Sequence, residues 1–432
     1  MESRRKKHTK KIKRLIFASF SSMLLLGVVT YAWFVGMKTV NVSTFDVKIA
    51  AIDSLSLSLD GEHWADTIDI SKDTYNTDSY TGNTNSWGGS GLIPVSTVGK
   101  IDTTSSRMVL FEKGSLTPTF GGYRIMASQV RNTVSGNAEQ DGYVVFDLFI
   151  KNLSGNEYYQ DLNQLNEEAI YLTIDSEVTV AENGGVANTG IENSVRVAFA
   201  QIGRVKATTA DVSTITGITC ATNTAVTGIC ADRDAQIWEP NDTKHVTNAI
   251  NWYNTSCARR TGASVIDTAS YASSYGTCGT VVDGTSYNTY AISGVIDYSD
   301  EVNVYDGTDY NSYTGSVAAA ATTGKLVAYD YFTDTEKNLE GTDRPTFITL
   351  APNSITKVRI YVYIEGQDVD NYDFASLGKK ITVNFGFTKE RFFDEDFDYS
   401  NPEGAELPTD VQRAEHPAYD YQAPENQSGN ND

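Results

Sequence analysis

Hydrophobic positions along the chain form one long uninterrupted run and many short alternating ones. The long run is Leu15–Val35, 21 residues without a charged side chain, and about 20 apolar residues suffice for a helix to cross a bilayer core of about 30 Å. Residues 1–14 before it carry eight Lys and Arg and one Glu. By the positive-inside rule, this end stays in the cytoplasm and the rest of the chain lies outside.

The same run also fits an export signal, with a basic n-region, an apolar h-region and a loosely cleavage-like step at Thr30-Tyr31-Ala32. A permanent anchor through residues 15–35 and a signal that is removed both satisfy this pattern. In either case we expect the bulk of the chain at the cell surface, membrane-anchored or secreted.

Downstream of this run, apolar and polar residues alternate with the period of two that is typical of strands. The predicted inward faces are Leu55, Leu57 and Leu59; Val144, Phe146, Leu148 and Ile150; Val195, Val197 and Phe199; Val358, Ile360, Val362 and Ile364; and Ile381, Val383, Phe385 and Phe387. We expect the strands at 355–364 and 381–387 to be antiparallel neighbours, covered by those near 55, 145 and 197. A short helix is predicted at 161–169.

These elements predict an all-β chain built as an antiparallel β-sandwich with an insertion. Its predicted parts are a basic n-region (1–14), a transmembrane or signal segment (15–35), the first part of the sandwich (36–205), a Thr/Ser/Tyr-rich insertion (206–324), the last strands (325–390) and a disordered acidic tail (391–432). The insertion is also open to a second reading, as a partly disordered loop region.

The four cysteines all fall inside the predicted insertion. An even, clustered set in an exported chain indicates disulfides, and the pairing of Cys220 with Cys230 and of Cys257 with Cys278 is one of three possible connectivities. A metal site is the weaker interpretation, because the chain has no CxxC pair and His245 is the only histidine nearby.

The charge of the chain argues against nucleic acid as a partner. The formal net charge is -21, and without residues 1–14 it becomes about -28, since 26 basic and 54 acidic residues remain. Binding to nucleic acid depends on Lys and Arg that neutralise phosphates, and this surface repels them.

Residues for catalysis are scarce. Four histidines occur in 432 residues, and the chain has no HExxH, GxSxG or GxxxxGK[ST] motif. We therefore expect no enzyme, with a surface hydrolase as a minor alternative. No cofactor is expected except, weakly, Ca²⁺, whose oxygen ligands two acidic clusters could supply. Their residues are Asp368, Asp370 and Asp373, and Asp394, Asp396 and Asp398. A polar hairpin turn and a solvated tail are the plainer interpretations of these clusters.

Both ends of the predicted sandwich resemble a known family. The basic n-region, the apolar run that closes in Thr30-Tyr31-Ala32-Trp33-Phe34, and the later Leu-Ser-Leu-Ser-Leu-Asp-Gly at 55–61 resemble exported Gram-positive proteins of the TasA/camelysin type, which carry SipW-dependent-type signals. The block from Leu350-Ala351-Pro352-Asn353 to Phe387, with Tyr363-Ile364-Glu365-Gly366-Gln367-Asp368 between its strands, resembles the late strands of such proteins. The resemblance implies a jelly-roll-like sandwich.

The resemblance also implies a non-enzymatic surface or biofilm-matrix structural protein, some members of which polymerise by lending an N-terminal strand to a neighbour. Residues 40–49 would be the lent segment if the signal is cut, and the candidate side chains are Val40, Val42, Phe45, Val47 and Ile49. The alternative is a membrane-anchored adhesin or glycan-binding module that binds through residues 206–324. The expected partners are thus the membrane, other copies of the chain or other surface proteins.

Overall fold

The computed structural model describes residues 42–51, 54–71, 85, 91–119, 122–130, 139–155, 157–180, 189–252, 281–287, 290–296, 304–305, 326–339, 343–372 and 379–389. The predicted signal or membrane segment, Cys257, Cys278 and the acidic tail lie outside these residues. Within them, no helix is both long enough and apolar enough to cross a membrane. Strands dominate, and the prediction of an all-β chain is confirmed.

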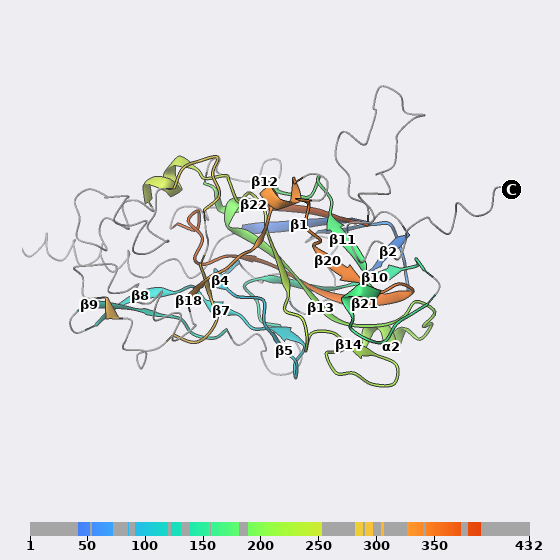
Figure 1. Ribbon diagram of the computed structural model, residues 1–432. Coiled ribbons are helices and arrows are strands. Elements are labelled where there is room, and N and C mark those ends of the chain that lie inside the picture. The colour runs from blue at the N-terminus through green and yellow to red at the C-terminus, as the bar shows by residue number, and fades with distance from the viewer. Residues whose placement is uncertain are drawn as a thin grey trace, which may run out of the picture.

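The larger of two main sheets has the strand order β19-β15-β13-β21-β10-β2, with β14 beside β13. Its three long central strands run side by side (Figure 1). The bounds of its strands are β2 (Leu55–Ser58), β10 (Val144–Asn152), β13 (Val195–Lys206), β14 (Thr227–Gly228), β15 (Gln236–Glu239), β19 (Phe332–Thr333) and β21 (Ser354–Ile364).

The second main sheet has the order β20-β11-β22-β1-β3, with β12 also paired to β22. Its strands are β1 (Val42–Ala51), β3 (Thr67–Ser71), β11 (Glu168–Leu172), β12 (Glu177–Val180), β20 (Ile348–Leu350) and β22 (Lys379–Thr388). This sheet is mixed, because β1 runs parallel to β22 and antiparallel to β3. In the first sheet, β15 and β19 are likewise parallel.

Short elements complete the described chain, and β8, β9 and β18 lie at the end of the molecule opposite β2 and β11 (Figure 1). The short strands are β4 (Val95–Ser96), β5 (Ile101–Asp102), β6 (Arg107–Met108), β7 (Phe111–Glu112), β8 (Ser115–Thr119), β9 (Gly122–Met126), β16 (Tyr290–Ile292), β17 (Val304–Tyr305) and β18 (Leu326–Ala328). The short helices include η1 (Gln164–Asn166), η2 (Ile191–Ser194), α2 (Val212–Thr216) and α6 (Asp334–Lys337).

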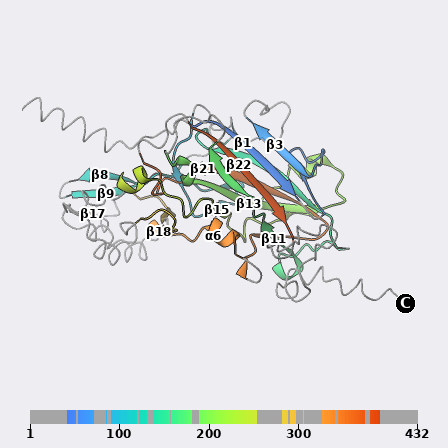
Figure 2. The ribbon, with the colours of Figure 1, turned by 90° about the horizontal axis from the view of Figure 1, so that it is seen from above.

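The two main sheets share one apolar core, and Figure 2 shows β1, β3 and β22 lying over β13 and β21. Phe199 of β13 is the centre of an aromatic cluster in this core. Its ring meets those of Phe347, Phe385 and Phe387 edge-on, with centroids 4.9, 5.1 and 5.8 Å away. Edge-to-face rings stabilise beyond the area they bury. The inward faces predicted for β10, β13, β21 and β22 are all found in this core.

A second apolar core covers the other face of the larger sheet. Tyr143, Val145, Tyr361 and Tyr363 point into it and are at most 1% exposed. Residues 95–130 and 215–235 supply side chains from the covering side. All eleven residues of β21 are therefore buried, whereas the alternating pattern had predicted burial of one face.

Two predictions of local structure are wrong. Residues 161–169 form only the short 3-10 helix η1 before β11 begins. The side chains of Glu167 and Glu168 point in different directions, to Arg204 and to Asn152, as those of consecutive residues in extended chain do. The strands β21 and β22 are not neighbours but lie in different sheets. In the turn that follows β21, the Gly366 N–H donates to the carbonyl of Val95 (2.7 Å).

The predicted insertion is joined to the larger sheet at its start. Within it, β15 pairs with β13, and the indole of Trp238 is fully buried in the core between the sheets. A disulfide links Cys220 to Cys230, which confirms that pair, and both cysteines lie in the second core. The cross-link closes a short loop that covers β13.

The central ring of the aromatic cluster gives a test of the shared core. We expect Phe199→Ala to lower the free energy of unfolding by about 3 to 5 kcal/mol, because it removes three ring contacts and leaves a cavity. Urea denaturation of the two proteins measures this difference. Leu165→Ala is the control: its side chain is 62% exposed, and we expect a change within about 0.5 kcal/mol. A loss below about 1 kcal/mol for Phe199→Ala would contradict the described packing.

Candidate functional site

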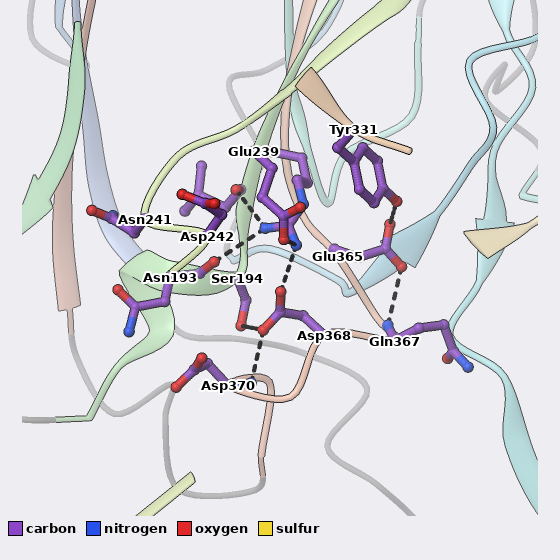
Figure 3. A network of polar contacts seen from close by, with 12 residues as sticks. Asn193, Ser194, Glu239, Asn241, Asp242, Tyr331, Glu365, Gln367, Asp368 and Asp370 are labelled. Carbon is purple, nitrogen blue, oxygen red and sulfur yellow. Dashed lines mark hydrogen bonds and ion pairs between the residues drawn. The ribbon is translucent and has the colours of Figure 1, made fainter. Parts of the chain in front are cut away.

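Buried charged side chains gather where the chain leaves the larger sheet after β21 (Figure 3). Glu365, Asp368 and Asp370 belong to the turn after this strand, and Arg196 and Glu239 belong to β13 and β15. All five side chains are shielded from solvent. We call this group the Arg196 cluster.

The guanidinium of Arg196 holds the cluster together. Its Nη2 donates to the carboxylates of Glu239 and Asp368, the latter at 2.5 Å. Its Nη1 donates to the main-chain carbonyls of Asn193 and Val195, and the ring of Tyr331 lies 5.0 Å from the guanidinium carbon. Burial alone would lower the pKa of Arg196, but the two carboxylates outweigh burial and raise it. The ion pairs thus replace the water that burial removes.

Glu365 is the carboxyl of the cluster whose donors among the described residues are neutral. It accepts from the hydroxyl of Tyr331 at 2.9 Å and from the main-chain N–H of Gln367 at 3.0 Å. Its own N–H donates to the carbonyl of Ser194 at 2.8 Å. Burial raises the pKa of Glu365 to about 7, although the N–H of Gln367 and the charge of Arg196 oppose the shift.

Asp370 pairs with the only described histidine of the interior. The Nδ1 of His245 lies 2.8 Å from the Asp370 carboxylate, and its Nε2 lies 3.1 Å from the carbonyl of Thr285. A carbonyl only accepts, so Nε2 carries a proton, and an imidazolium would satisfy both contacts. Burial lowers the pKa of His245, but Asp370 outweighs burial and raises it.

Two of the six residues of the weakly predicted metal sites belong to this cluster. Asp368 and Asp370 lie close together but face Arg196 and His245, and Asp373, Asp394, Asp396 and Asp398 lie outside the described residues. No group of three or more Asp, Glu, His or Cys in the described part of the chain is arranged to hold a metal ion. The polar-turn interpretation of this segment fits the contacts: Asp368 Oδ1 accepts from the Asp370 N–H at 2.7 Å.

A separate polar hollow of about 490 Å³ lies beside η1 and β20. Side-chain amides of Gln164, Gln201 and Gln236 line it, together with charged residues 232–234 and residues 346–349. The side-chain amide of Gln201 has a structural hydrogen bond, because it donates to the carbonyl of Thr349 at 2.8 Å. Gln236 is exposed, so its amide is open to a ligand.

The strand-exchange candidates lie in β1 as far as the structure describes them. Val47 and Ile49 are buried in the core between the sheets. Val42 and Phe45 belong to the same strand, and Val40 lies outside the described residues. β1 pairs with β22 at nine positions and with β3 at five.

Comparison with known proteins finds no matching family model, no matching curated protein and no matching solved structure. Function is therefore inferred from the residues themselves. Sequence patterns had not predicted Arg196, Glu239 or Glu365 as members of one site, because they come from β13, β15 and the turn after β21. A charged residue inside a strongly apolar strand, such as Arg196 in VRVAFA, is the one local signal that could have drawn attention to it.

The raised pKa of Glu365 makes the stability depend on pH. The folded state holds this proton up to about pH 7, whereas an unfolded glutamic acid releases it near pH 4.5, so the contribution is lost as the pH rises between these values. Glu365→Gln keeps the shape of the side chain but cannot ionise. We therefore expect its free energy of unfolding to fall less between pH 5 and pH 8 than that of the wild-type protein, by up to about 3 kcal/mol. Urea unfolding of both proteins at pH 5 and pH 8 measures it.

Glu62→Gln is the matched control, because Glu62 is exposed on the turn after β2. We expect this variant to follow the wild-type protein at both pH values. If Glu365→Gln and the wild-type protein lose equal stability between pH 5 and pH 8, Glu365 is ionised in the folded protein and the raised pKa is wrong.

Proposed function

We propose that the chain is a non-enzymatic structural protein of the cell surface or biofilm matrix, outside the cytoplasmic membrane, that polymerises by exchanging its N-terminal strand. The jelly-roll arrangement implied by the family resemblance is part of this proposal. The position of β1 is the observation that carries it. This strand is the first described element, and it fills a slot between β22 and β3.

The slot can be filled from outside because β1 has a single covalent connection to the described body. The strand contributes Val47, Ile49 and Ala51 to the core, and it continues only into β2 through residues 52–54. The β1 strand of a second copy would make the same hydrogen bonds and the same apolar contacts. Exchange therefore costs no native contact and links subunits head to tail.

The other features of the chain fit a surface location. The Cys220–Cys230 disulfide suits an oxidising compartment, and the basic residues 1–14 with the apolar run 15–35 suit export. The doubly covered larger sheet gives a stiff unit, as a load-bearing element requires.

A pair of cysteines across β1 and β22 tests strand exchange. Lys48 and Asn384 are register partners on the outward face of the sheet, and neighbouring strands lie within disulfide reach. We expect oxidised Lys48→Cys/Asn384→Cys protein from the cell surface to form a ladder of covalent oligomers on a non-reducing gel. The ladder should collapse to monomer on reduction, because the cross-linked strands belong to different chains.

Thr179→Cys/Thr382→Cys is the matched control, because these register partners of β12 and β22 belong to one chain in either arrangement. It should remain monomeric after oxidation, as should the parent protein, which sets the background from Cys257 and Cys278. Monomers alone from Lys48→Cys/Asn384→Cys would refute exchange and favour a tethered protein. The N-terminal mass separates these cases further, since exchange requires a mature end near Trp33.

The polar hollow beside η1 and β20 favours the second candidate function, an anchored adhesin that binds glycans. Amide and carboxylate groups hydrogen-bond sugar hydroxyls, and Asp234 and Gln236 bring them to the wall of this hollow. If the protein binds cell-wall polysaccharide, Gln236→Ala should weaken retention on immobilised polysaccharide about tenfold, on the order of 1.4 kcal/mol. Glu62→Ala, far from the hollow in sequence, is the control. Equal retention of both variants would exclude this hollow as the glycan site.

A further inference from the structure

A lysine, an asparagine and a glutamate meet in the interior where the two main sheets come together. Asn152 is the last residue of β10 in the larger sheet, Glu168 is the first residue of β11 in the other sheet, and Lys389 directly follows β22. Their exposed fractions are 0, 1 and 2%. Each comes from a different strand, so the fold itself assembles the group.

The contacts within the group place a nucleophile, an acyl carbon and a proton carrier together. The Nζ of Lys389 lies 3.5 Å from Oδ1 of Asn152 and 3.4 Å from Oε2 of Glu168. The same Oε2 accepts from Nδ2 of Asn152 at 2.6 Å. The carboxylate therefore touches both the attacking amine and the amide nitrogen that would leave, as a proton shuttle in acyl transfer must.

The orientation of the Asn152 amide is fixed by its other contacts. Its Nδ2 donates to the carbonyl of Ala351 at 3.1 Å, and its Oδ1 accepts from the N–H of Ser154 at 3.2 Å. The hydroxyl of Ser154 lies 2.6 Å from the same oxygen. These donors face the oxygen on which negative charge would develop.

One atom of the group lacks a partner. Oε1 of Glu168 is buried and has no hydrogen-bond partner among the described residues. An unsatisfied buried carboxylate oxygen costs stability, and such groups are commonly found where chemistry is performed. A second buried lysine pair is arranged differently: Lys357 contacts Asp147 at 3.1 Å, and Arg359 also donates to both oxygens of this carboxylate.

We propose that Lys389 and Asn152 form an intramolecular isopeptide bond, with Glu168 as the proton carrier. The neutral amine of Lys389 attacks Cγ of Asn152, and a C–N bond forms while the carbonyl oxygen takes the negative charge beside Ser154. Glu168 accepts a proton from Nζ and passes it to Nδ2. The bond from Cγ to Nδ2 then breaks and ammonia leaves. No oxidant, metal or cofactor is needed.

The bond would join β10 to the end of β22 and so fasten the two main sheets to one another. It would close a loop between residues 237 positions apart in sequence. The same group without a bond would be an ordinary buried ion pair with a hydrogen-bonded amide. Peptide mass distinguishes the two. The proposal does not depend on strand exchange or glycan binding.

The test is a tryptic map of the reduced full-length protein. Trypsin should yield the peptide 152–196 joined to 381–391, uncleaved after Lys389, at a mass about 17 Da below their sum, which is the mass of one ammonia. Both Glu168→Gln and Lys389→Met should give two separate peptides and migrate more slowly on a denaturing gel. Lys357 should be unlinked in every protein.

Glu167→Gln is the matched control, because Glu167 is an equally buried neighbour that pairs instead with Arg204 and Arg233. It should keep the joined peptide even if it lowers stability. Separate peptides at full mass from the folded wild-type protein would overturn the proposal, whether or not the variants fold. A joined peptide in Glu168→Gln would overturn the role of Glu168.

Discussion

Burial of the larger sheet on both faces is the constraint on which the rest of the structure depends. Every residue of β21 is buried, so its polar side chains lose contact with water and need partners inside the protein. The hydroxyls of Thr356 and Tyr363 have none among the described residues. Arg359 meets this need through Asp147 at 2.7 Å, and Tyr361 through Glu139 at 2.9 Å. Polar contacts also tie the covering strands to this sheet, because the N–H of Met108 in β6 donates to the hydroxyl of Tyr361 at 3.0 Å.

The inward faces of the long strands could be predicted from the sequence, because a period of two is a local property of the chain. Which strands pair could not be predicted: ITKVRIYVYI and ITVNFGF look like partners, but β21 and β22 lie in different sheets. The second core was also hidden, since Tyr361 and Tyr363 occupy positions that fit a solvated face equally well. Buried clusters assembled from distant strands, such as the one around Arg196, leave almost no local signal.

The excess of acidic over basic residues does not extend to the interior of the protein. A net charge of -21 describes mainly the solvated chain, because the described interior holds as many buried Lys and Arg as buried Asp and Glu. Arg196 and Arg204 each hold buried carboxylates, whereas Glu365 has only neutral donors in hydrogen-bond contact. An interior carboxylate such as Glu365, whose described hydrogen-bond donors are neutral, is where stability depends on protonation.

The proposed bond and the proposed exchange are compatible, because one would fix β22 covalently and the other needs β1 to be held only by non-covalent contacts. β22 is the template on which β1 lies, and a covalent tie from Lys389 to β10 would hold that template in place while the slot beside it is empty. β1 itself is retained by hydrogen bonds and by apolar side chains such as Val47 and Ile49, which another copy supplies equally well. A chain under tension would then transmit load through β1 into a sheet that cannot peel from its partner at the tied end. Strength between subunits would come from the buried length of one strand, and strength within a subunit from a covalent bond.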